Sequence, residues 1–227
     1  IMEYDDMIEF TFGRWDPDNS NPDSLLGLGF KCVNIGATRI SGIEFSIGGN
    51  GKIGDMELSI LGSYTYINPI ILNPNDVYYS YENNGVIEQV TYTDDPSEGG
   101  ASSDTGPNGN LLKYRNKHLL KLDIQADTEH MSFGVSARYN SFMQNVDGIF
   151  ESDVFNGPSA LIDFGITDSR KRFIDGDLIF DTRFSVKINP QITLSAIIDN
   201  FYNVEYQIRP AYIGPPRTFS VKLTAKI

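Results

Sequence analysis

The feature that most constrains the fold is a two-residue alternation of apolar and polar side chains, which recurs along the whole sequence. The C-terminal stretch "FSVKLTAKI" (residues 219–227) is one example, with apolar residues at its odd positions and polar residues at its even positions. This period is typical of a β-strand with one apolar and one polar face. No helical period of comparable length is present. About eight strands are predicted, near residues 8–12, 39–49, 56–66, 118–126, 132–140, 178–188, 192–198 and 219–227.

The connections between these runs alternate between short and long. The short ones are rich in Gly, Asn, Asp and Pro, which favour tight turns, and cover residues 49–55, 126–130 and 189–191. The long ones cover roughly residues 15–30, 70–112, 146–176 and 204–214. Loops of this length are uncommon in a compact soluble domain. Short turns at one end and long loops at the other are typical of outer-membrane β-barrels.

Composition and charge narrow the class further. Of the 227 residues, 40% are apolar and 12% aromatic, which is too apolar for a disordered chain. No apolar run approaches the ~20 residues of a membrane helix, but a membrane β-strand needs only about 10 residues, half of them apolar. The net charge of −12 argues against nucleic acid or an anionic lipid surface as the main partner. The single cysteine, Cys32, cannot form an internal disulfide and is expected to be a small, half-buried residue.

Strand length and aromatic residues favour a membrane barrel over a soluble β-sandwich binding module. Several alternating runs exceed the ~5–6 residues of an average strand. Aromatic residues end three runs on the long-loop side, as in the aromatic girdles of membrane barrels. These residues are Tyr64, Tyr66, Tyr139, Phe142, Phe201 and Tyr202. In a barrel the apolar set would face lipid, and the polar set, which mixes charges of both signs, would face the lumen. The predicted lumen set is Glu57, Ser59, Lys121, Asp123, Gln125, Ser136, Arg138, Asn140, Asp181, Arg183, Lys187, Thr193, Ser195 and Asp199.

Three motifs resemble a known family. They are "NIGATRISGIE" (residues 34–44), "YRNKH" (residues 114–118), and "DNFYNVEY" followed by "PPRTF" (residues 199–206 and 215–219). In this order they resemble the C-terminal part of TonB-dependent outer-membrane receptors, in the style of the Bacteroidetes branch. The resemblance implies an all-β fold: an antiparallel transmembrane β-barrel segment of about eight strands, the C-terminal part of a 22-stranded barrel. Residues 1–227 would form this one domain, with the plug domain and the N-terminal strands absent. The chain departs from the pattern at Ile227, where such barrels usually end in an aromatic residue.

The resemblance also implies a function and a location. The chain would be part of a TonB-dependent transporter in the outer membrane of a Gram-negative bacterium, taking up a scarce ligand such as an iron chelate, cobalamin or a glycan. The implied partners are the remaining barrel strands and plug domain of the same receptor, TonB through the missing N-terminal part, and outer-membrane lipid. A surface lipoprotein is a further candidate. An alternative stays open: a complete eight-stranded barrel with a structural or adhesive role, which requires the first strand to pair with the last.

No catalytic site is expected. His118 and His130 are predicted at opposite ends of one strand, and neither has an obvious nucleophile nearby. No phosphate-binding loop, cofactor site or transition-metal site is indicated. The acidic stretches at residues 16–24 and 94–104 lack the spacing of a calcium loop and are expected to be solvated.

The candidate ligand-contacting residues lie near the predicted long-loop ends of the strands. In the family, such residues and the extracellular loops hold the ligand. The candidates are Arg138, Asn140, Gln144, Asn145, Tyr206 and Arg209. Arg209 can meet an anionic ligand, whereas the alternative role of Tyr206 and Arg209, which we favour, is to fix the last loop to the barrel rim. Asn200 and Asn203 are expected to satisfy backbone groups of that loop.

Overall fold

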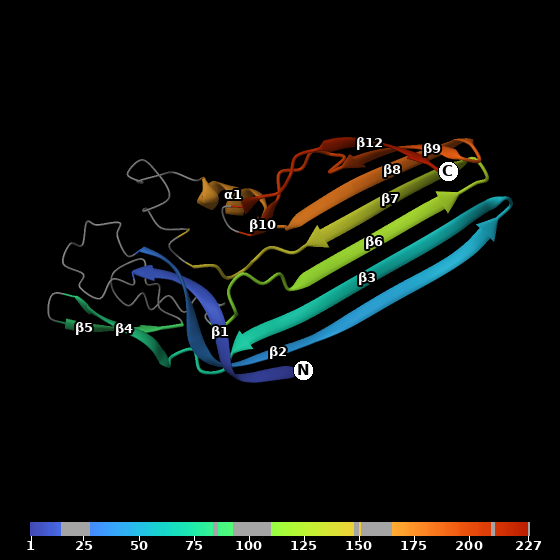
Figure 1. The fold of residues 1–227 in the computed structure, drawn as a ribbon. Coiled ribbons are helices and arrows are strands. Elements are labelled where there is room, and N and C mark those ends of the chain that lie inside the picture. The colour runs from blue at the N-terminus through green and yellow to red at the C-terminus, as the bar shows by residue number, and fades with distance from the viewer. Residues whose placement is uncertain are drawn as a thin grey trace. The chain divides into compact units, whose positions relative to one another are not determined.

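Eight strands form one antiparallel sheet in the order β1-β2-β3-β6-β7-β8-β9-β12 (Figure 1). The computed structural model describes residues 1–14, 28–83, 86–92, 110–147, 150, 165–209 and 212–226. The prediction of an all-β antiparallel sheet of eight strands is confirmed, because each predicted run overlaps a different strand of this sheet. The strands are β1 (Met2–Arg14), β2 (Leu28–Ile53), β3 (Met56–Ile71), β6 (His118–Asp127), β7 (Met131–Asn140), β8 (Asp177–Asn189), β9 (Ile192–Asp199) and β12 (Thr218–Ala225).

The long connections contain smaller elements that the alternation did not predict. β4 (Val77–Asn83) and β5 (Val86–Thr91) form a hairpin, and β10 (Gln207–Arg209) pairs with β11 (Tyr212–Ile213). The helix α1 (Ile166–Arg172) has Asp168 in its first turn and basic residues in its last turn, which complements the helix dipole. Among the described residues, no helix has the length and apolar character needed to cross a membrane.

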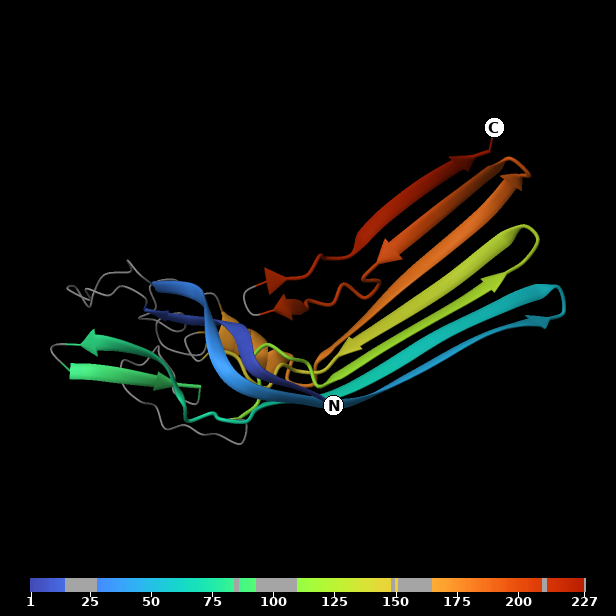
Figure 2. The same cartoon turned by 60° about the horizontal axis from the view of Figure 1, so that its bottom comes forward.

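The short connections are tight turns, as predicted. They join β2 to β3, β6 to β7 and β8 to β9, and Figures 1 and 2 show them together at one end of the sheet. Thr128 closes one turn, because its hydroxyl and backbone amide both donate to the carbonyl oxygen of Met131. Asn189 closes another, because its side-chain oxygen accepts hydrogen bonds from the backbone amides of Gln191 and Ile192.

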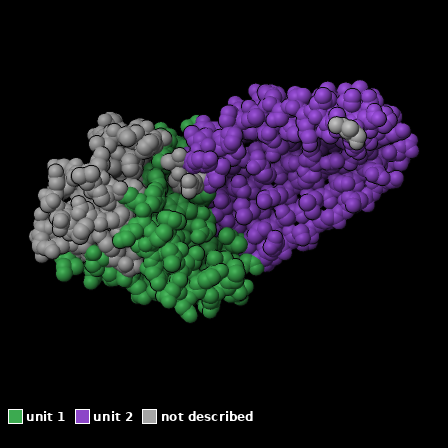
Figure 3. Space-filling view, in the orientation of Figure 1, with its two compact units in different colours: residues 1–42, 67–115, 143–172 green, residues 43–66, 116–142, 173–227 purple. Residues whose placement is uncertain are grey.

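The chain divides into two compact units (Figure 3). Unit 1 comprises residues 1–42, 67–115 and 143–172, and unit 2 comprises residues 43–66, 116–142 and 173–227. The division falls within β2 and β3, so both strands contribute to both units.

In unit 2, strand register gathers the polar residues on one face of the sheet, here called the polar face. Asp123 of β6 lies opposite Ser136 of β7, which lies opposite Asp181 of β8. The other face, here called the apolar face, exposes a continuous set of large apolar side chains. They include Ile43, Phe45, Ile47, Leu120, Leu122, Ile124, Phe133, Phe184, Leu194, Phe219, Val221 and Leu223. A soluble sandwich would bury such a face under a second sheet. The described residues of unit 2 supply no second sheet over it.

In unit 1, the pattern of burial is different. Val33 and Ile35 of β2 are buried with Ile71, Tyr92 and Leu112 in a small apolar core. In a strand that faces a polar lumen, these inward positions would carry polar side chains. In this part of β2 they carry apolar ones. This explains why the sequence predicted a strand from about residue 39, whereas β2 begins at Leu28. Cys32 precedes Val33 in the strand, so its side chain points to the opposite face. It is exposed there, so the expectation of a half-buried cysteine is wrong.

The sheet order has β1 at one end and β12 at the other. In the described part of the chain, β1 pairs with β2 and β12 pairs with β9, and no pairing joins β1 to β12. A complete eight-stranded barrel requires that pairing.

Candidate functional site

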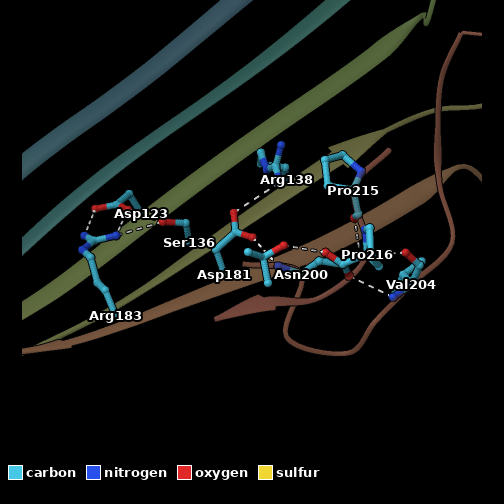
Figure 4. A network of polar contacts seen from close by, with 10 residues as sticks. Asp123, Ser136, Arg138, Asp181, Arg183, Asn200, Val204, Pro215 and Pro216 are labelled. Atoms are coloured by element: carbon cyan, nitrogen blue, oxygen red, sulfur yellow. Dashed lines mark hydrogen bonds and ion pairs between the residues drawn. The ribbon is translucent and has the colours of Figure 1, made fainter. Parts of the chain in front are cut away.

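The polar face of unit 2 carries a network centred on Arg183 (Figure 4). The two terminal nitrogens of Arg183 each lie 2.7 Å from a carboxylate oxygen of Asp123, two strands away. The guanidinium also donates to the hydroxyl of Ser136 at 3.0 Å and to the amide oxygen of Gln125 at 3.0 Å. A two-bonded arginine–carboxylate pair is among the stronger polar contacts of proteins. The network around Arg183 therefore fixes β6, β7 and β8 relative to one another.

A second chain of polar contacts begins at Arg138, one of the predicted ligand-contacting residues. A terminal nitrogen of Arg138 lies 3.3 Å from one carboxylate oxygen of Asp181. The other oxygen of Asp181 accepts a hydrogen bond of 2.8 Å from the backbone amide of Asn200. The Nε of Arg138 is buried and has no hydrogen-bond partner among the described residues. Asp181 therefore connects the polar face to the end of β9 (Figure 4).

The side chain of Asn200 holds the base of the last long connection. Its amide nitrogen donates to the carbonyl oxygens of Val204 and Pro215, and its amide oxygen accepts from the backbone amide of Val204. Asn203 accepts from the backbone amide of Arg217. Both asparagines have left-handed backbones, with φ of 52° and 54°, a conformation that asparagine tolerates well. These contacts agree with the expectation that the two asparagines satisfy loop backbone groups.

Unit 1 contains a buried polar cluster that the sequence did not predict. Tyr92 donates to Glu9 at 3.0 Å, and its hydroxyl accepts from the backbone amide of Lys113 at 2.7 Å. Arg115 forms an ion pair of 3.3 Å with Glu9. Burial raises the pKa of Glu9 above its ordinary value, although the charge of Arg115 opposes this. Burial and the charge of Glu9 together raise the pKa of Tyr92 well above its ordinary value.

The second half of this cluster is centred on Asp147, which is fully buried. Its carboxylate accepts from the ammonium group of Lys113 and from the hydroxyls of Thr11 and Tyr114. Burial and the neighbouring charge of Asp147 raise the pKa of Tyr114. The cluster joins β1 to segments near residues 92, 114 and 147. The signals in the sequence were the polar phase of the first predicted strand and the "YRNKH" motif, but no local pattern indicates that these two segments meet.

The six predicted ligand-contacting residues are distributed over both units. Arg138 and Asn140 lie two residues apart on the polar face of β7, in unit 2. Gln144 and Asn145 belong to unit 1. Gln144 is exposed, whereas Asn145 donates through its side chain to the carbonyl oxygen of Leu111.

Tyr206 and Arg209 lie in the last long connection, in unit 2. Tyr206 is buried, and a Cβ atom on Gly214 would overlap its ring. Its carbonyl oxygen also accepts from the backbone amide of Gly214 at 2.8 Å. These contacts agree with a role for Tyr206 in fixing the loop. Arg209 pairs with Tyr212 through its backbone, and its side chain lies outside the described residues.

Aromatic residues gather at the long-loop end of unit 2, as the girdle prediction requires. Tyr64 shares a hydrogen bond of 2.8 Å with Nδ1 of His118, and the ring of Tyr66 lies 5.1 Å from the same imidazole. Tyr202 packs edge-on against both Phe180 and Phe201.

His118 is the first residue of the ten-residue strand β6 and His130 lies in the turn after it, so the two histidines are at opposite ends of this strand. The part of the chain that the structure describes has no group of three or more His, Cys, Asp or Glu residues placed to hold a metal ion. The acidic stretches at residues 16–24 and 94–104 lie outside the described residues.

An antiparallel sheet with one exposed apolar face, one polar face, tight turns at one end and aromatic residues at the other defines an outer-membrane β-barrel protein. Residues 1–201 match the family model described as TonB dependent receptor-like, beta-barrel. The chain belongs to the TonB-dependent receptor family and resides in the outer membrane of Gram-negative bacteria. Members of this family are not enzymes, in agreement with the sequence-based expectation.

Comparison with solved structures gives the same fold. The chain is similar to the closed form of the ferric-catecholate import receptor Fiu from K12 E. coli, with a TM-score of 0.53 and 20% sequence identity. The match covers 89% of this chain and 22% of the receptor chain, so the present chain spans about a fifth of that receptor's length. Comparison with curated proteins gives no significant match.

Family membership assigns the two faces of the sheet. The apolar face contacts lipid and the polar face lines the barrel interior. A membrane strand needs about 10 residues, which fits β6 and β7, whereas the 26 residues of β2 exceed this length. The alternating apolar residues Ile43, Phe45 and Ile47 mark the lipid-facing part of β2, so residues 28–42 extend beyond it. Glu9 lies opposite Val33 and is therefore outside the membrane-spanning part.

Proposed function

We propose that this chain is the C-terminal barrel segment of a TonB-dependent transporter that takes up a scarce ligand, such as an iron chelate, cobalamin or a glycan. The upstream part of the same receptor supplies the plug domain, the remaining strands of a 22-stranded barrel and the segment that contacts TonB. The motif style further suggests a receptor of the Bacteroidetes branch, in which a surface lipoprotein is a candidate partner.

The observation that supports this proposal best is the family match over residues 1–201, combined with a polar face that carries charges of both signs. A face of this kind suits a wide lumen that holds a plug and a ligand path. Arg138 and Asn140 lie at the long-loop end of this face and are the first ligand contacts that we propose. Tyr206 and Arg209 would act from the last connection, and Gln144 and Asn145 from the segment after β7.

Uptake measurements test the proposal. The gene is deleted in its host, and uptake of labelled iron–catecholate, cobalamin and oligosaccharides is compared with the parent strain, with and without a functional TonB. Iron–catecholate is the first probe because the similar solved receptor is described as importing it. We expect loss of TonB-dependent uptake for one ligand class. Unchanged uptake of every class would overturn the proposal.

Substitution of the proposed contacts refines the test. Arg138→Gln and Asn140→Ala should raise the half-saturating ligand concentration about tenfold, the effect of losing one charged or two neutral hydrogen bonds. Ser185→Ala is the matched control, because Ser185 lies on the same face nearer the turn end of β8 and bonds Ser195. An equal effect of the control would remove Arg138 and Asn140 from the ligand path.

The alternative function is a complete eight-stranded barrel with a structural or adhesive role. The open sheet order of the described residues disfavours it. Residues 1–227 alone, refolded into lipid vesicles, should not give a protease-resistant, heat-modifiable barrel. Formation of such a barrel by this chain alone would support the alternative.

A further inference from the structure

The polar face and the last long connection are joined by one carboxylate, that of Asp181. One oxygen lies 3.3 Å from Arg138 of β7, and the other accepts the backbone amide of Asn200 at 2.8 Å. Figure 4 shows the three residues in a row, with the side chain of Asn200 continuing to Val204 and Pro215. Arg138 therefore helps to hold the Asp181 carboxylate in place. The carboxylate in turn holds the base of the loop through the backbone amide of Asn200.

The Arg138 end of this row is the one that a lumenal ligand can change. Its side chain is 42% exposed, whereas that of Asp181 is 21% exposed. The ion pair is long at 3.3 Å, and the buried Nε of Arg138 has no hydrogen-bond partner among the described residues. An anionic or carbonyl-bearing group on the polar face would compete with Asp181 for the exposed part of the guanidinium.

The Asn200 end holds the base of the loop through hydrogen bonds to Val204 and Pro215. Asn200 and Asn203 hold left-handed turns, and their side chains fix Val204 and Arg217. Tyr206 then packs against Gly214, which closes the base of residues 204–214. A displacement of the Asn200 amide is therefore transmitted to both ends of the connection.

We propose that Asp181 is a positioning residue that couples the state of Arg138 to the order of the loop base, formed by Val204, Tyr206 and Gly214. With Arg138 paired to it, Asp181 holds the Asn200 amide and the loop base is closed. When a ligand draws Arg138 away, the carboxylate loses its second anchor and the loop base loosens. This inference rests on the proposed function only in that a ligand engages Arg138, because the coupling itself is a property of the free receptor.

Hydrogen exchange of the complete receptor in detergent tests the coupling without any ligand. The variants are Arg138→Gln, Asp181→Asn, which retains an acceptor for Asn200, and the double variant. Arg183→Gln is the matched control, since Arg183 also pairs with an aspartate on the polar face but bonds Asp123, Ser136 and Gln125.

We expect Arg138→Gln to speed exchange of the Val204 and Gly214 amides about three- to tenfold, the factor that one hydrogen bond controls. Asp181→Asn should act similarly, and the double variant should exchange no faster than the faster single variant. Arg183→Gln should leave these amides within about twofold. Unchanged exchange in Arg138→Gln would overturn the inference, as would a double variant whose effect is the product of the two single effects.

Transport is measured separately on the same variants, with iron–catecholate as the probe. Loss of the exchange response with normal uptake overturns the coupling and leaves the proposed function standing. The expected exchange response without any uptake in the unmodified receptor overturns the proposed function and leaves the coupling standing.

Discussion

The guanidinium of Arg183 lies directly over the Cα of Gly134, its partner in the β7–β8 register. A Cβ atom at position 134 would lie 2.6 Å from Cζ of Arg183, which is far inside van der Waals contact. Arg183 reaches Asp123 on β6 because the intervening strand carries no side chain at this point. A glycine in a strand interior commonly marks such a close approach.

Gly134→Ala should therefore displace Arg183 and weaken its pair with Asp123. We expect a loss of roughly 1–2 kcal/mol in unfolding free energy, measured by urea unfolding of the receptor in lipid vesicles. Gly48→Ala is the control, because a Cβ atom there would meet only ordinary contacts with Leu61 and the backbone of Ile60. Equal losses in the two variants would show that Arg183 does not depend on the gap at Gly134.

Asp147→Asn should strongly destabilise unit 1. Asp147 is fully buried, and its replacement removes the carboxylate that pairs with the buried ammonium group of Lys113. Breaking a buried pair in this way costs about 3–5 kcal/mol. Thermal unfolding and exchange of amides 92 and 113–115 measure the effect.

Removal of both charges distinguishes the contribution of the ion pair to stability from that of the other contacts in the cluster. The double variant Asp147→Asn with Lys113→Met should recover part of the loss, because both charges of the buried pair are then removed together. A double variant that is less stable than Asp147→Asn alone would contradict this account.

Glu9 should make the stability of unit 1 depend on pH. Because burial raises the pKa of Glu9, the folded protein keeps its proton to a higher pH than the unfolded chain. The resulting stabilisation is complete below the ordinary Glu pKa of about 4.3 and is lost as pH rises through the folded pKa. Glu9→Gln should flatten this fall in stability, as measured by unfolding midpoints between about pH 4 and 8.

The control for the pH experiment lies on the same strand. Glu3→Gln is the matched control, because Glu3 is an exposed glutamate of β1. A profile that is the same in Glu9→Gln and the unmodified protein would assign the pH dependence to another group.

Gly214→Ala should open the last connection. A Cβ atom at this position overlaps the ring of buried Tyr206, so either the ring or the backbone must move. Limited proteolysis of whole cells should cut residues 204–214 severalfold faster than in the unmodified receptor. Gly51→Ala, where a Cβ atom meets nothing within 4 Å, should cut at the unmodified rate. An unaltered rate in Gly214→Ala would mean that Tyr206 does not fix the loop.

The membrane-spanning strands could be predicted from sequence because their two faces meet different surroundings. Lipid on one side and a polar lumen on the other impose strict alternation, which β7 shows throughout and β6 shows from Leu120 onward. The same signal weakens at residues 28–38 of β2, where Val33 and Ile35 face a packed core. Both phases of a strand can then be apolar, and alternation no longer marks it.

The candidate site was predicted less well than the fold. Arg138 and Asn140 were placed on the correct face because alternation fixes the side on which a strand residue lies. Asn145 and Tyr206 were chosen by position in the chain, and their contacts depend on partners such as Leu111 and Gly214 in distant or folded-back segments. The cluster around Asp147 joins residues more than a hundred positions apart, which no local pattern in one sequence encodes.

Asn200 and Asn203 bind the segment just before β12, at Pro215 and Arg217, and together form a clamp. Because of this clamp, the length of the last loop does not affect the register of the last strand. Residues inserted between 205 and 213 lie outside the clamp, so β12 would still start at the same point against β9. One residue inserted between 200 and 203 would instead shift β12 by one position and turn Phe219, Val221 and Leu223 from lipid into the lumen. The loop can therefore change in length, and hence in what it can bind, without a change in the strand that follows.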